Sequence, residues 1–157
     1  MYNVPENLVE LVEAAYVEEK SGDMTQAEKL YRSALALKHP YATYTYFLFL
    51  VSLGREEDAE PYFDEALQDK FPAALVRQGF RLARKNSELE RSSEFYTDLQ
   101  SVANSGHLVA KQILLENEVR FGAFRRIPIV MLKFISLRLQ QMLRTNFGRK
   151  VIVEAWF

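Results

Sequence analysis

The feature that most constrains the fold of this chain is an internal repeat with a step of 32 residues. The segment AEKLYRSAL at 27–35 recurs as AEPYFDEAL at 59–67, and KHPYA at 38–42 recurs as KFPAA at 70–74. Gly22 and Gly54 precede the two blocks at the same interval. A period of roughly 20–50 residues is typical of stacked-repeat architectures, in which each unit buries its apolar side against its neighbours. The sequence therefore predicts a linear array of similar units.

A second, fixed interval divides each unit into two helices. An alanine is followed 12 residues later by Gly or Asn in three places: Ala42 to Gly54, Ala74 to Asn86 and Ala110 to Gly122. Gly and Asn tolerate the left-handed conformation that commonly ends a helix. Apolar residues between these points recur at helical spacing. We expect turns at Gly22, 38–40, Gly54, 70–72, Asn86, Gly106 and Gly122.

Two patterns of the capping-box type predict where helices begin. Thr25 stands three residues before Glu28, and Ser87 stands three residues before Glu90. In such a box the hydroxyl and the carboxylate each accept a hydrogen bond from a free amide of the first turn. We therefore expect helices to start at Thr25 and at Ser87.

The repeated residues resemble tetratricopeptide-like repeats, and more particularly the Sel-one-like variety. The pattern of that family stands here as Ala27, Tyr31, Ala34, Pro40 and Ala42, and again as Ala59, Phe63, Ala66, Pro72 and Ala74. Small residues allow paired helices to approach closely, and the aromatic residue fills the space between neighbours. The resemblance implies an all-α fold, a right-handed α-solenoid of about four helix-turn-helix repeats. We expect one domain over 1–157, with repeats at about 8–38, 39–70, 71–106 and 107–147 and an apolar tail at 148–157.

The resemblance also implies a function, because such arrays act as non-enzymatic adaptors or assembly scaffolds. They bind a peptide or protein along a concave groove lined by the first helix of each pair. The residues expected at groove positions are Val12, Tyr16, Tyr41, Tyr44, Leu48, Val76 and Phe80. Phe47 and Leu50 are expected to pack inside. The alternative interpretation of these aromatic residues is ordinary core between helices, because the segment 41–50 is apolar almost all round.

Nothing in the sequence indicates catalysis or a cofactor. There is no cysteine, so disulfides, thiolate nucleophiles and cysteine-ligated zinc are excluded. The two histidines, His39 and His107, fall at equivalent turns without the spacing of a metal site, and we interpret them as turn residues. Neither a phosphate-cradling glycine loop nor a G-x-S-x-G nucleophile motif is present. We predict no enzyme activity, no metal and no cofactor.

Charge is distributed unequally along the chain. Residues 119–153 contain eight Lys or Arg and no acid, interleaved with Ile, Leu, Met and Phe. The expected basic surface comprises Arg125, Arg126, Lys133, Arg138 and Arg144. This pattern supports an alternative function, a peripheral protein that binds anionic lipid through a basic amphipathic C-terminal helix. Self-association through that helix would also cover its apolar side. Nucleic acid is a less favoured partner, because the acidic first half would repel phosphates.

The location of the protein is predicted from two negative observations. Residues 1–10 have no positively charged region of the kind that opens a signal peptide. The most apolar stretch, 127–143, contains Lys133 and Arg138 and is shorter than the ~20 apolar residues of a membrane span. We therefore expect a cytoplasmic protein, either free or peripheral to the membrane.

Overall fold

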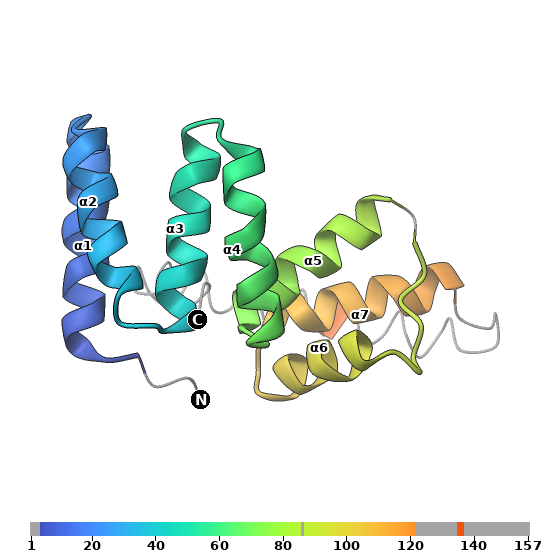
Figure 1. Ribbon diagram of the computed structural model, residues 1–157. Coiled ribbons are helices and arrows are strands. Elements are labelled where there is room, and N and C mark those ends of the chain that lie inside the picture. The colour runs from blue at the N-terminus through green and yellow to red at the C-terminus, as the bar shows by residue number, and fades with distance from the viewer. Residues whose placement is uncertain (1–3, 86, 122–134, 137–157) are drawn as a thin grey trace. The chain divides into compact units, whose positions relative to one another are not determined.

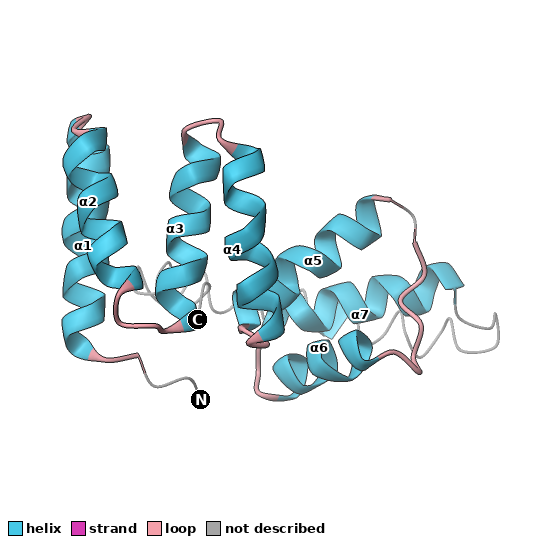
Figure 2. Ribbon diagram, viewed as in Figure 1, coloured by secondary structure: helices cyan, strands magenta, loops and turns pink. Residues whose placement is uncertain are grey.

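The computed structural model describes residues 4–85, 87–121 and 135–136, and all regular structure within them is helical (Figure 2). This part of the chain confirms the prediction of an all-α fold. The helices are α1 (Glu6–Ser21), α2 (Met24–Leu35), α3 (Pro40–Ser52), α4 (Glu56–Gln68), α5 (Pro72–Arg84), α6 (Glu94–Asn104) and α7 (Leu108–Phe121) (Figure 1). They form two compact units, Met1–Ala74 and Leu75–Phe157. The single stack of four repeats over 1–157 stays a prediction.

The chain turns at three of the glycines where the sequence predicts a turn. Gly22, Gly54 and Gly106 adopt positive φ angles of 93°, 72° and 106°, so each reverses the chain in a conformation that L-residues rarely adopt. The other two turns use lysine at the corresponding position, with φ 51° at Lys38 and 54° at Lys70. The predicted turns at Asn86 and Gly122 lie outside the described residues.

The two predicted capping boxes are wrong, because a nearby polar residue caps each helix instead. Thr25 already lies inside α2, whose N-cap is Asp23: the backbone N–H of Gln26 donates to the Asp23 carboxylate at 2.9 Å. Residues 87–92 form no helix, and α6 begins after Ser93, whose hydroxyl accepts from the backbone N–H of Tyr96 at 3.2 Å. Both true caps are residue types that favour this position.

The core of the N-terminal unit is built from the repeated alanines and aromatic residues. α1 packs on α2, α3 packs on α4, and α2 also contacts α3 (Figure 1). The signature alanines are fully buried: Ala27, Ala34, Ala42, Ala59, Ala66 and Ala74. Ring centroids lie 4.8 Å apart for Tyr31 and Phe49 and 5.0 Å apart for Phe47 and Phe63. Helix α3 is buried on most sides, as its almost wholly apolar sequence predicts.

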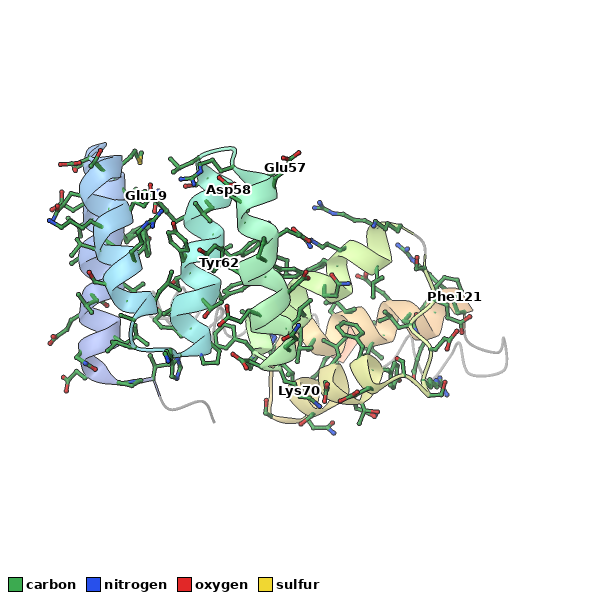
Figure 3. All side chains as sticks on the ribbon, viewed as in Figure 1. Glu19, Glu57, Asp58, Tyr62, Lys70 and Phe121 are labelled. Atoms are coloured by element: carbon green, nitrogen blue, oxygen red, sulfur yellow. The ribbon has the colours of Figure 1, made fainter. Side chains whose placement is uncertain are left out.

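A polar cluster around Glu28 links α2 to α3. The Glu28 carboxylate accepts from the guanidinium of Arg32 at 2.8 Å, from the hydroxyl of Tyr46 at 3.1 Å and from Arg55 at 3.4 Å. The hydrogen bond from Arg32 does most to lower the pKa of Glu28, and Tyr46 and Arg55 add to the effect. Arg55 also pairs with Asp58 at the start of α4, where Figure 3 labels Asp58. The carboxylate therefore stays ionised between three donors, which fixes how the two helices meet.

The C-terminal unit is held by close packing and by one buried amide. α6 packs on α7. A Cβ atom at Gly79 of α5 would lie 3.2 Å from two carbons of Ile113 and 3.4 Å from Leu99, so glycine permits the close approach of three helices. The side chain of Asn117 accepts from the backbone N–H of Leu89 at 2.9 Å and donates to its carbonyl at 3.2 Å. These bonds attach the connection between α5 and α6 to α7.

Candidate interaction surface

The positions predicted for the groove lie on α1 and α3 of the N-terminal unit and on α5, whose residues from Leu75 onward belong to the C-terminal unit. Val12, Tyr44 and Val76 follow one another at the repeat step of 32, and all three are buried. Four residues later in each helix stand Tyr16, Leu48 and Phe80, which are exposed or half-buried. The seven predicted groove residues thus divide into an inward-facing series, an outward-facing series and Tyr41, which is half-buried.

Tyr44 belongs to the hydrophobic core of the N-terminal unit. Its side chain is only 4% exposed. Its ring centroid lies 5.6 Å from that of Phe47 and 5.4 Å from that of Phe71. Tilted aromatic pairs at this separation stabilise a hydrophobic core, so the Tyr44 ring mainly stabilises the folded unit. Phe47 and Leu50 are buried as the sequence predicts.

Partly exposed side chains from α1 and α3 gather on one side of the N-terminal unit. We call this surface the α1–α3 face and define it by Glu13, Tyr16, Tyr41, Thr45 and Leu48. Tyr16 is 53% exposed, and Tyr41 and Leu48 pack partly on the core. Burial raises the pKa of Tyr41, and the negative charge of Glu13 raises it further, which places that carboxylate near the ring. Two helices therefore contribute to a single surface.

A hydrogen-bond network around Glu19 supports this face. The hydroxyl of Tyr31 donates to one carboxylate oxygen of Glu19 at 3.1 Å, and the hydroxyl of Ser52 donates to the other at 3.1 Å. Burial raises the pKa of Tyr31, and the Glu19 charge adds to the effect, so the phenol keeps its proton. Figure 3 labels Glu19 on α1. The network links α1, α2 and α3 and holds the α1–α3 face in one geometry.

In the C-terminal unit, α5 presents an aromatic residue among arginines. Phe80 is 39% exposed, whereas Val76 is buried. Four Lys or Arg and no acid stand in 77–85, and Arg77, Arg81 and Arg84 are at least partly exposed. Helical spacing puts Arg77 and Arg84 on the same side as Phe80. The sequence interpretation missed this basic surface, although the run of positive charge in 77–85 could have revealed it.

The two histidines act at helix starts, as their turn positions predict. The Nδ1 atom of His39 accepts from the backbone N–H of Tyr41 at 3.1 Å, at the start of α3. The Nδ1 atom of His107 accepts from the backbone N–H of Ala110 at 3.4 Å, at the start of α7. Burial lowers the pKa of His107, which favours the neutral ring that can accept this bond. Over the described residues, no three His, Asp or Glu side chains gather as metal ligands would.

The predicted basic surface lies outside the described residues. It comprises Arg125, Arg126, Lys133, Arg138 and Arg144, and the apolar tail at 148–157 lies outside them too. Binding of anionic lipid and self-association through the C-terminal segment therefore stay predictions. Among the helices described, none combines the length and the apolar character needed to cross a membrane.

Comparison with known proteins does not identify a family for this chain. No protein-family model, no curated protein and no solved structure matches the chain. The likeness to tetratricopeptide-like and Sel-one-like repeats therefore rests on the repeated residues and on the helices that they form.

Proposed function

We propose that this chain is a non-enzymatic protein–protein interaction module, an adaptor or assembly scaffold. In this proposal it is a right-handed α-solenoid of about four repeats, and the first helix of each repeat presents side chains to a partner. The observation that carries the proposal is the recurrence of Tyr16, Leu48 and Phe80. These apolar residues stand at one repeat position in three successive first helices, and each is at least partly accessible to solvent.

The fold does not require Tyr16, Leu48 and Phe80 to be accessible to solvent. Val12, Tyr44 and Val76 supply the inward-facing contacts of the same helices. Contact between an apolar ring and water is unfavourable, and covering the ring with a partner lowers the free energy of the complex. Tyr and other aromatic anchors contribute much of the binding energy of protein interfaces. Within the N-terminal unit, Tyr16 and Leu48 both belong to the α1–α3 face, so one partner could cover both.

The test compares outward-facing positions with a matched control. A photo-crosslinking residue replaces Tyr16, Leu48 or Phe80 in the full chain. As a control, the same residue replaces Leu37, which is also exposed and lies in the turn after α2. A partner crosslinked from the first set but not from Leu37 is then purified. Tyr16→Ala and Leu48→Ala should each weaken its binding, by roughly 30-fold if each anchor contributes ~2 kcal/mol. Leu37→Ala should leave the affinity unchanged.

Two results would contradict the proposal. One is crosslinking that is equally strong from Leu37. The other is a partner whose affinity is insensitive to both Tyr16→Ala and Leu48→Ala while the variants stay folded by circular dichroism. Vesicle co-sedimentation tests the lipid alternative separately, since only pelleting with anionic vesicles that falls with added salt supports it.

A further inference from the structure

The α1–α3 face combines accessible apolar side chains with a negative edge. Tyr16, Tyr41 and Leu48 supply the apolar part, and Glu13 stands on α1 one turn before Tyr16. Residues 4–74 contain 14 Asp or Glu against 6 Lys or Arg, so the whole N-terminal unit is negative. This charge bears on the kind of partner that the face can accept.

Three exposed carboxylates of α1 stand beside the face. Glu6, Glu10 and Glu13 are exposed at spacings of four and three residues, which put them on one side of α1. The described residues include no ion pair or side-chain hydrogen bond to any of these carboxylates. Glu19 and Glu28 differ, because their oxygens accept from Tyr31, Ser52, Tyr46 and two arginines. Glu6, Glu10 and Glu13 therefore remain accessible to a partner beside the α1–α3 face.

The ring of Tyr16 already attracts a cation. The ammonium nitrogen of Lys20 lies 4.9 Å from its centroid. The face of an aromatic ring favours ammonium and guanidinium groups, and the attraction increases when a partner excludes water. A positive side chain arriving near Tyr16 would therefore meet the Glu13 carboxylate and the electron-rich ring together.

We propose that the α1–α3 face binds a basic, amphipathic segment of a partner protein. Apolar side chains of that segment would cover Tyr16, Tyr41 and Leu48, while its Arg or Lys residues would pair with Glu13 and with the carboxylates of Glu6 and Glu10. An acidic segment or an anionic lipid surface would be repelled from the same unit. The inference rests on the proposed function and adds the chemical class of the partner.

The test uses the full chain and two synthetic amphipathic peptides of equal length. They share the same Leu and Phe positions, and one carries Arg where the other carries Glu. By fluorescence anisotropy the Arg peptide should bind, the Glu peptide should not, and added salt should weaken binding. Glu13→Lys should reduce the affinity about tenfold, the effect of ~1.4 kcal/mol, and Tyr16→Ala should reduce it as well. Glu65→Lys makes the same charge change at an exposed site on α4 and is the matched control.

The possible results separate the two proposals. Equal losses for Glu13→Lys and Glu65→Lys would mean attraction to net charge only, which would overturn the inference. Binding of the Glu peptide that depends on Tyr16 would overturn it too, but would leave an interaction module in place. If neither peptide binds, the partner class is wrong, and the crosslinking experiment alone decides the function. A full chain that is dimeric by analytical ultracentrifugation, and that Glu13→Lys makes monomeric, would identify a second copy as the occupant instead.

Discussion

Replacing Asn117 by leucine should destabilise the C-terminal unit by about 2–4 kcal/mol. Leucine has nearly the same shape but cannot pair with the backbone of Leu89, whose N–H and C=O groups both bond to the Asn117 side chain. Asn117 is 8% exposed and Leu89 is also buried, so water cannot easily replace the lost partner. Two hydrogen bonds contribute about 1 kcal/mol each, and stranding two buried polar groups adds further cost, which together give that range.

The assay is hydrogen exchange read by mass spectrometry, together with denaturant unfolding followed by circular dichroism. Exchange should accelerate in 87–93, the connection that Asn117 attaches to α7, before it accelerates in α6. Gln100→Leu makes the same type of change at an exposed position of α6 and should stay within about 0.5 kcal/mol of the unchanged chain. If Asn117→Leu matches Gln100→Leu in both measurements, the two hydrogen bonds do not support the connection as argued.

Asn117→Asp tests the same contact through pH. A carboxylate can accept from the Leu89 N–H, but its second oxygen would face the Leu89 carbonyl, whereas a protonated carboxyl could donate there as the amide does. Burial raises the folded-state pKa of such a group above the ordinary value of about 3.9. The stability of the variant should therefore be greatest below about pH 4 and fall as pH rises through the raised pKa. Stability that is independent of pH relative to Asn117→Leu would refute this account.

Three further changes test the packing, the polar cluster and a histidine cap. Ala34→Leu and Ala66→Leu should each overpack a fully buried site and lower the free energy of unfolding by about 1–3 kcal/mol, as measured by thermal denaturation. If both variants melt at the temperature of the unchanged chain, the repeat register is wrong. Tyr46→Phe should cost about 1 kcal/mol by removing a donor to Glu28, and a double-mutant cycle with Glu28→Gln should show coupling, whereas additive losses would contradict it. The pKa of His107 is lowered in the fold, so stability should decline as pH falls below about 6.5, where the unfolded chain takes up a proton first. His107→Asn keeps a capping acceptor but does not titrate, so it should flatten that decline, and an unchanged slope would assign the pH dependence to other groups.

The fold could be predicted from the sequence where backbone conformation restricts the residue type. The turns at Gly22, Gly54 and Gly106 could be predicted, because these positions have positive φ angles that few residues other than glycine adopt without strain. Helix starts were harder to predict, since several residues in a row can cap. Asp23 competes with Thr25, and Ser93 lies six residues beyond Ser87, so a motif alone could not choose between them.

The sequence could not predict which side chains of the expected first helices are exposed and which are buried. The repeat register placed the expected positions on α1, α3 and α5, but it could not tell that Tyr44 points into the core while Leu48 stays half-buried. In α3 nearly every side chain is apolar, so no polar residue marks the side that faces water. The basic side of α5 is harder to predict, because the positive run in 77–85 is shorter than the one after Val119.

The cluster around Glu28 also determines where segments of this helical chain could be exchanged with those of another protein. Its donors Tyr46 and Arg55 and its carboxylate all lie within 23–55, a segment made of α2, α3 and the turns beside them. At the next step of 32 the glutamate recurs as Glu60, but the donor positions hold Gln78 and Ser87. The transferable module is therefore offset by one helix from the hairpin that the sequence repeat defines. A chimaera joined at Gly22 and after Arg55 would carry its ionic linkage intact, whereas one joined at Lys38 would divide it.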